Sequence, residues 1–454
     1  MRKLLTGIAA TIVLASCTPA GPAATTRAAQ SLPPMKSFQG QQLERPSASN
    51  SDIARDFMDL SFRLESGRDL QIFTRFEGPI TLRLTGNAPS YLKRDLTRLL
   101  ARLKAEAGIE ITMTQDSAAS ITINAVRRRD IQRHLPQAAC FVVPNISDIS
   151  EYARASRSPK TDWLQLQDRK KIAIFVPSDA PPQELRDCLH EELAQALGPL
   201  NDLYRLPDSV FNDDNIHTVL TSYDMLILRA YYAPELHNGM RRAEVANRLP
   251  GILSRLNPAG RSLPSRPLRT TPRRWIEDIQ LALGPGTPPM ARHAAARDAL
   301  ALAEAQGWTD HRRAFSHYAL GRLTQGLNAE VALSHFRAAK TFYTRSPVTQ
   351  LHAAHVAAQL AAYALTEGNA NEALLQTGPY LAVAARHENA ALLSTLLLLR
   401  AEALDLLGRT EEAETVRLDS LGWARYGFGS DRAVRAKLNE ITALSPLNRG
   451  NGQS

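Results

Sequence analysis

A short stretch near the middle of the chain holds the residues whose types and spacing are best suited to chemistry. It runs from Cys188 to Asp202 and reads Cys-Leu-His-Glu-Glu-Leu-Ala-Gln-Ala-Leu-Gly-Pro-Leu-Asn-Asp. A zinc-binding helix needs histidines at positions i and i+4, and a glutamate beside the first one to activate water. In the register that starts at His190, Ala194 stands where the second histidine must be. This register therefore does not make a zinc site.

A register shifted by one residue has the spacing of the metzincin peptidase motif, H-E-x-x-H-x-x-G-x-x-H. Glu192 then takes the place of the general base, and Gly198 takes the place of the turn that brings the third ligand round. The three histidine positions hold Glu191, Gln195 and Asn201. All three are oxygen donors, which calcium and magnesium prefer and zinc does not. We therefore expect no zinc and no cofactor.

A weak metal site with oxygen ligands stays open as an alternative. Asp202, Asp213 and Asp214 would add charge to it if the loop after the helix folds back. A further alternative is that Glu191 and Gln195 only make hydrogen bonds inside a former cleft. A glycosidase-like pair is disfavoured, because adjacent residues point about 100° apart on a helix and cannot flank one bond.

Three motifs in order resemble a bacterial family known as domain of unknown function two-nine-two-seven. They are Cys188-Leu-x-Glu-Glu-Leu-x-Gln-Ala-Leu-Gly198, Ser209-Val-Phe-Asn-Asp-Asp-Asn215, and Leu220-Thr-Ser-Tyr-Asp224 followed by Leu228-Arg-Ala-Tyr-Tyr232. The resemblance covers roughly the first domain, and the family's similarity to zinc peptidases implies their sheet-and-two-helix fold. It also implies a cleft near which we place Tyr223 and the loop aspartates.

The order of predicted elements is independently consistent with an α+β domain that contains a mixed sheet. Leucines at helical spacing predict a helix over residues 89–108, and Pro181-Pro182 opens a second helix that ends at Gly198. We expect this second helix to follow an edge strand of the sheet. Short β-branched or aromatic runs predict strands at residues 70–76, 80–84, 109–113, 120–126, 140–143 and 171–176.

The second half of the chain is predicted to be an all-α helical repeat. We place the first domain at residues 51–257, a linker rich in proline and arginine at 258–274, the repeat at 275–447 and a disordered tail at 448–454. Gly326, Gly368 and Gly408 recur at intervals of 42 and 40 residues. Ala332 with Phe336 resembles part of the tetratricopeptide pattern, although the interval is longer than the usual 34 residues. Such solenoids usually present a surface to a partner.

The start of the chain predicts export and lipidation. Positive charge at Arg2 and Lys3, a short apolar run and Leu-Ala-Ser before Cys17 resemble a lipoprotein signal over residues 1–16. Lipid on Cys17 would anchor a disordered tether over residues 17–50. In a Gram-negative host, Thr18 after the cysteine favours an outer-membrane lipoprotein that faces the periplasm. The alternative is an ordinary cleaved signal with a chance cysteine.

Charge and cysteine content are consistent with the cell envelope. The formal net charge of +9 suits contact with anionic lipid, polysaccharide or peptidoglycan, and no nucleic-acid-binding motif accompanies it. Cys140 and Cys188 are the only cysteines besides Cys17. They are expected to pair in an oxidising compartment, and two unpaired buried thiols are the alternative.

These observations lead to one functional hypothesis and one rival. The hypothesis is a lipid-anchored protein whose metzincin-like domain has lost zinc chemistry, so that it works as a non-catalytic binding or assembly factor with an envelope protein or glycan as partner. The rival is an active peptidase or other hydrolase that uses Glu192 with an atypical metal or with none. A substrate or partner is not identified by these residues.

Overall fold

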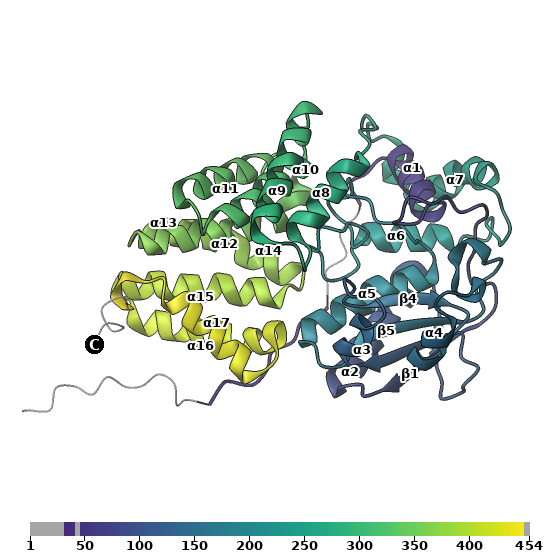
Figure 1. Ribbon diagram of the computed structural model, residues 1–454, viewed down its shortest axis with the longest axis horizontal. Helices are drawn as coiled ribbons and strands as arrows, with labels where there is room; N and C mark the ends of the chain where they lie inside the picture. Colours follow the sequence, from purple (N-terminus) through teal and green to yellow (C-terminus); the bar gives the residue numbers. More distant parts are fainter. Residues whose placement is uncertain (1–30, 41–45, 449–454) are drawn as a thin grey trace, which may run out of the picture.

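The computed structural model describes residues 31–40 and 46–448, which form a mixed α/β part followed by an all-helical part (Figure 1). We call residues 46–261 the sheet domain and residues 273–448 the helical domain. The predicted signal, Cys17 and residues 449–454 of the predicted tail lie outside the described residues. None of the helices in the described part is long and apolar enough to span a bilayer.

The sheet domain is built on one five-stranded mixed sheet. Its order is β2-β1-β3-β5-β4, in which β4 is antiparallel to β5 and the other neighbours are parallel. The strands are β1 (Ile80–Gly86), β2 (Ile111–Met113), β3 (Ile121–Val126), β4 (Phe141–Pro144) and β5 (Ile172–Pro177). The helices are α1 (Asn50–Ser61), α2 (Ser90–Arg102), α3 (Arg128–Gln132), α4 (Ile149–Ala155), α5 (Pro182–Leu197), α6 (Ser222–Tyr231) and α7 (Arg242–Leu256).

The side chains of β5 point alternately to the two faces of the sheet, and both faces are covered. Ile172, Ile174 and Val176 belong to the main core, which includes residues of α2 and α5, whereas Ala173 and Phe175 point to a smaller cluster with α3 and α4. All five side chains are fully buried, as expected for an inner strand that is covered on both sides. The motif helix α5 therefore rests on the middle of the sheet through its apolar face.

Two expectations about the sheet are wrong. Residues 70–76 form no strand, because Phe73 exchanges backbone hydrogen bonds with Met240 and Gly239 instead of with a sheet neighbour. Helix α5 also does not follow an edge strand, because β4 pairs on the outer side of β5 and makes β5 an inner strand. The helix predicted over 89–108 is present as α2, continues as a π-helix over Leu103–Ala107, and ends at Gly108 with a positive φ of 71°.

The predicted disulfide is confirmed. Cys140 lies just before β4, Cys188 lies on α5, and their Cα atoms are 5.9 Å apart. The bridge joins an edge of the sheet to the helix that packs on it, and it closes a segment with a sequence separation of 48 residues.

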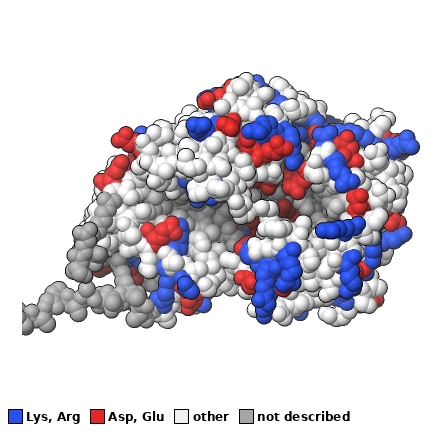
Figure 2. Space-filling view, in the orientation of Figure 1, with Lys and Arg blue, Asp and Glu red and all other residues white. Residues whose placement is uncertain are grey.

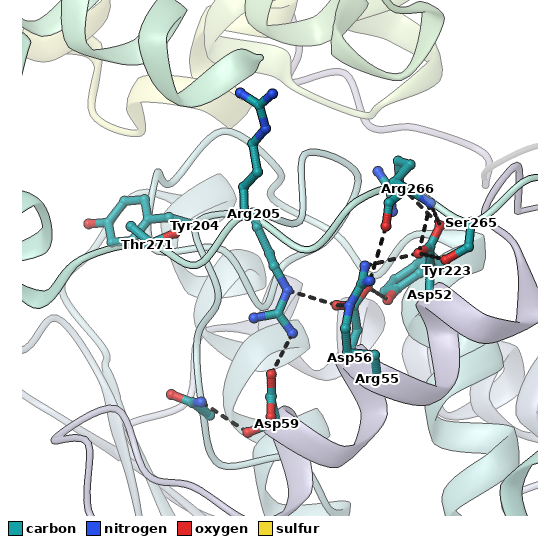
Figure 3. A network of polar contacts seen from close by, with 12 residues as sticks. Asp52, Arg55, Asp56, Asp59, Tyr204, Arg205, Tyr223, Ser265, Arg266 and Thr271 are labelled. Atoms are coloured by element: carbon teal, nitrogen blue, oxygen red, sulfur yellow. Dashed lines mark hydrogen bonds and ion pairs between the residues drawn. The ribbon is translucent and has the colours of Figure 1, made fainter. Parts of the chain in front are cut away.

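Acidic residues of α1 form hydrogen bonds with the linker, with the loop after α5 and with helix α6 (Figure 3). Asp52 accepts hydrogen bonds from the backbone of Arg266 and from the Ser265 hydroxyl, which holds the proline-rich linker against α1. Asp56 accepts from Arg205 at 2.8 Å and from the Tyr223 hydroxyl at 3.0 Å. The linker and the loop after α5 are therefore both held by one short helix.

The helical domain consists of antiparallel helix pairs followed by a last helix. The pairs are α8 (Arg273–Leu283) with α9 (Pro289–Ala305), α10 (His311–Thr324) with α11 (Ala329–Tyr343), α12 (Gln350–Thr366) with α13 (Ala370–Thr377), and α15 (Ala390–Leu406) with α16 (Thr410–Phe428). The short α14 (Leu381–Arg386) precedes the last pair, and α17 (Asp431–Thr442) packs on it.

The recurring glycines lie at the turns of these pairs. Gly326, Gly368 and Gly408 each stand between the two helices of a pair, and the last two have φ near 74°, a conformation that glycine adopts without strain. Gly321 has a different role, because a Cβ there would meet the Phe336 ring at 2.9 Å. Close approach of α10 and α11 therefore requires glycine at this position.

Residues 31–40, expected to belong to a disordered tether, lie along α16. The Lys36 amide donates to the Gly422 carbonyl at 3.0 Å, and the Phe38 ring stacks on Trp423 with centroids 4.5 Å apart. Arg98 of α2 donates to the Phe38 carbonyl at 2.6 Å. This segment therefore contacts both domains.

Removal of the disulfide should cost considerable stability. Closing a loop of this length stabilises a fold by about 4 kcal/mol in the chain-entropy model, so the double change Cys140→Ser and Cys188→Ser should lower the free energy of unfolding by roughly that amount. Urea denaturation with and without dithiothreitol measures it. The reductant should destabilise the wild-type chain and leave the double variant unchanged; equal stability of the two oxidised proteins would contradict the prediction.

Candidate functional site

Helix α5 positions the motif residues, and both of its ends are fixed by specific contacts. Pro182 occupies the first turn, where its missing N–H leaves no bond unmade. At the other end, the buried Arg169 guanidinium donates to the carbonyls of Gln195, Ala196 and Gly198. A cation that binds the last carbonyls also interacts favourably with the helix dipole. Arg169 therefore terminates the motif helix.

One face of α5 remains partly accessible while the rest of the helix is covered. Asp187, Glu191 and Gln195 are half-buried, and their spacing of four residues places them on one stripe. Figure 2 shows a hollow between the two halves of the molecule with acidic side chains on its wall. Two positions of the motif, Glu191 and Gln195, thus share a stripe that solvent can reach.

Carboxyl groups from several segments gather around Glu191. We call them the acidic cluster, which comprises Glu65, Asp187, Glu191, Glu192, Asp202 and Asp213. Burial together with the nearby Glu192 and Asp187 raises the pKa of Glu191 well above its ordinary value. Burial also raises the pKa of Asp187 to about 7, even though Arg186 lies beside it. The cluster therefore holds protons at neutral pH that isolated carboxyls would release.

Glu65 and Asp202 share a hydrogen bond within the cluster. Burial raises the pKa of both, and their bond keeps the pKa of Glu65 lower and that of Asp202 higher. Asp202 is thus the donor of the pair and Glu65 the acceptor. Asp213 is held separately, because its Oδ2 accepts from the Tyr204 hydroxyl at 2.9 Å and from the Gln280 amide of α8 at 3.3 Å.

Glu192 is the most enclosed member of the cluster. Its side chain belongs to a residue that is 5% exposed, and its Oε2 has no hydrogen-bond partner among the described residues. Burial, with Glu65 and Asp187 nearby, raises its pKa to about 8. At pH 7 it is mainly a neutral carboxylic acid, which can donate a proton. A general base needs the ionised form, which this environment disfavours.

The other predicted site residues are engaged elsewhere. Asn201 is buried and donates its amide to the Asp59 carbonyl at 3.0 Å. Tyr223 points to Asp56 of α1 (Figure 3). Asp214 bonds His352 of α12 at 2.9 Å. Within residues 31–40 and 46–448, no three histidine, cysteine or acidic side chains are grouped so that they could hold one metal ion.

The covered side of α5 is part of the contact between the two domains. Gln183 bonds the Asn389 side chain and the Ala391 amide, at the start of α15. Arg186 donates to the Glu388 carboxylate at 2.8 Å and to the Glu388 carbonyl. Thus the helix that carries the motif also docks the helical domain.

A second contact between the domains is made by histidines around Asp214. His217 follows Asp214 in the loop after α5, and its ring lies 5.8 Å from that of His352 and 5.3 Å from that of His387. Burial lowers the pKa of His217 to about 4 and that of His352 to about 3. The rings of His217 and His352 are therefore neutral at pH 7 and pack as uncharged groups.

Several residues of the site are not among those predicted from the sequence. Asp187 was identifiable in principle, because it lies four residues before Glu191 on the same helical stripe. Glu65 was not, since it lies in a loop 126 positions earlier in the chain with no local pattern. Arg169 and Arg186 likewise have no signal in the sequence that separates them from the many surface arginines.

The fold and the site together define a mixed-sheet α/β domain with an acidic cluster beside α5, joined to helical pairs. Residues 50–251 match the family described as "Protein of unknown function (DUF2927)". This match confirms the family resemblance of the first domain, and the helical domain lies beyond the matched residues. No curated protein and no solved structure matches the chain.

Gly198 should tolerate no side chain. A Cβ at this position would meet the Tyr231 ring at 2.8 Å, so Gly198→Ala must displace a fully buried ring and should cost roughly 1 to 3 kcal/mol. The matched control is Gly251→Ala on the exposed face of α7, where a Cβ meets nothing within 4 Å and should be neutral or stabilising. Chemical denaturation measures both; equal effects would contradict the packing described for Gly198.

Glu192→Gln should stabilise the chain increasingly as pH rises. The folded state holds the Glu192 proton up to about pH 8, whereas the unfolded chain loses it near pH 4.5. The wild-type chain therefore loses stability relative to the variant between pH 5 and 8, by an amount on the order of a few kcal/mol. Denaturation at pH 5, 6, 7 and 8 measures the difference. Glu330→Gln, on an exposed turn of α11, is the control, and a constant difference for Glu192→Gln would refute the assignment.

Proposed function

We propose that the protein is a lipid-anchored, non-catalytic binding or assembly factor of the cell envelope. In this proposal the sheet domain is a zincin-like scaffold whose helix of metzincin spacing has a structural role, and the helical domain presents a tetratricopeptide-like surface to another envelope component. The single observation that carries the proposal is that the covered side of α5 contacts the helical domain through Gln183 and Arg186.

The topology of the sheet supports the zincin-like assignment in part. The zincin plan requires a mixed sheet, a long helix before its inner strands and a motif helix directly after an edge strand. The sheet is mixed, since β4 is antiparallel to β5, and α2 precedes the inner strand β3, whereas α5 follows the inner strand β5 and departs from the plan at this point. Because the motif helix also carries the disulfide and the contact with the helical domain, a scaffold role accounts for more of its residues than a catalytic role does.

A groove on the helical domain is the surface that we assign to partner binding. It has a volume of about 390 Å³ and is bordered by α11, α12 and α13. Lys340 lies within it, donates to Gln376 at 2.6 Å and has a pKa lowered by burial, and Arg337 lines the same groove. Tyr363 and Leu360 supply apolar area. Glu367 and Glu372 line it as well, so the groove carries both signs of charge and suits an extended peptide segment with charged side chains.

Export and anchoring rest on two features. The Cys140–Cys188 disulfide is typical of oxidising compartments such as the periplasm. Cys17 with the residues before it resembles a lipoprotein signal, and the chain enters the described part at Ser31 and lies along α16. We propose that lipid on Cys17 holds the protein at the outer membrane of a Gram-negative host, facing the periplasm.

Hydrolysis that uses Glu192 is the second candidate. The unpartnered Oε2 of Glu192 is the observation that favours it, because catalytic carboxyls are often buried groups with strongly shifted pKa values. The raised pKa weighs against a general base, since base catalysis of water attack needs the carboxylate ion at the working pH.

Complementation of a deletion strain distinguishes the two candidates. Glu192→Gln removes the ionisable group but keeps the shape, so it should restore the envelope phenotype fully. Reversal of the groove charges by Arg337→Glu with Lys340→Glu should fail to restore it, because the partner loses its ion pairs. The readout is survival under envelope stress at matched protein levels.

Two controls keep this test interpretable. Lys93→Glu reverses an exposed charge on α2 and should complement like the wild type. Cys17→Ser should release the protein from the membrane fraction, as measured by fractionation and by incorporation of labelled palmitate. Loss of complementation by Glu192→Gln, together with a stoichiometric transition metal in the purified protein, would overturn the proposal in favour of the hydrolase.

A further inference from the structure

We infer that the acidic cluster is a binding site for a basic peptide segment, whose arginine or lysine side chains enter the hollow beside α5. The cluster lies at the seam of the two domains, away from the groove on α11 to α13. The inference thus adds a second contact to the proposed function and names the chemistry of its ligand, and its failure would leave the groove untouched.

The first support is the imbalance of charge within the cluster. Five other carboxyl groups, from the Glu65 loop, from α5 and from the loop after α5, surround Glu191, and few cations offset them. Arg273 of α8 lies close enough to lower the pKa of Glu65, but its guanidinium donates to the Glu65 carbonyl and to Glu277. Arg186 is already occupied by Glu388. The chain thus supplies few cations of its own against which these carboxyl groups could ionise.

The second support is a pair of buried oxygens that lack a donor. Glu192 Oε2 and Asp202 Oδ1 are both buried and have no hydrogen-bond partner among the described residues. Glu192 belongs to a residue that is 5% exposed, and its charge is felt by Glu191 within the cluster. Buried polar atoms are nearly always bonded in folded proteins, so each of these oxygens indicates a donor that arrives from outside the chain.

The distribution of the oxygens favours an extended organic cation. Glu65 comes from the loop after α1 and Asp202 and Asp213 come from the loop after α5, while Asp187, Glu191 and Gln195 line one stripe of α5. A guanidinium offers five N–H donors in a planar fork and can bridge several carboxylates. The half-buried positions of Asp187 and Glu191 give such a side chain a way in from solvent.

Proton release is a signature of this binding. Because burial and mutual repulsion raise the pKa values of Glu191, Glu192 and Asp202, these groups are mainly neutral without a ligand. A bound cation stabilises their ionised forms and expels protons. Binding should therefore strengthen from pH 6 to pH 8, and its heat should depend on the ionisation enthalpy of the buffer.

Calorimetric titration of the full chain with a tri-arginine peptide tests the inference. The expected result is saturable binding with proton release, weakened about tenfold by Glu191→Gln and by Asp187→Asn, each of which removes one carboxyl group that ionises against the bound cation. Glu330→Gln should bind as the wild type does. A tri-citrulline peptide, which has the same shape without charge, should not bind.

Three outcomes would overturn the inference. These are equal affinity of Glu191→Gln and the wild type for tri-arginine, binding of the neutral peptide with the same affinity, or calcium or magnesium binding that needs Glu191 when tri-arginine does not bind. The net charge of +9 repels a cationic peptide elsewhere on the surface, so non-specific attraction does not imitate the expected result. The variants remove like charges from a crowded site, and circular dichroism checks that they stay folded.

Discussion

The docking of the helical domain on α5 is the constraint on which the rest of the structure depends, and Arg186 is its centre. This guanidinium is almost fully buried, pairs with Glu388, and lies 5.1 Å from the Tyr426 ring and 5.6 Å from the Phe38 ring. Tyr426 in turn donates to Asp95 of α2 at 2.7 Å. A buried cation is costly unless it is paired, so removal of either partner would leave an uncompensated charge. The motif helix is thereby fixed from the sheet side by its apolar residues and from the other side by this pair.

This arrangement explains the electrostatics of the candidate site. The loop after α5 is held between the domains, where His217 and Asp214 meet α12 and Tyr204 packs edge-on against Trp275. Confinement of that loop brings Asp202 and Asp213 close to Glu191 and excludes water from them, which raises their pKa values. The same surroundings make Glu192 a neutral acid at pH 7.

The sequence predicted the features that depend on local pattern. Helical spacing of leucines, with proline and glycine at the helix ends, located α2 and α5, and β-branched runs located the five strands. The pairing of Cys140 with Cys188 was predicted because cysteines of exported proteins meet an oxidising compartment. It failed at residues 70–76, where Phe73 exchanges backbone hydrogen bonds with Gly239 and Met240 instead of with a strand of the sheet. It also could not find Glu65 or Arg186, because their roles arise only when distant segments meet.

Differential scanning calorimetry of the full chain, with Arg186→Ala beside the wild type, tests the central claim most directly. If α5 unites the two domains through the buried pair, the wild-type chain unfolds in one cooperative transition. The variant then separates into two, because each domain keeps its own core while their contact is lost. Two well-resolved transitions in the wild type, or a single unchanged transition in the variant, would contradict this account of the molecule.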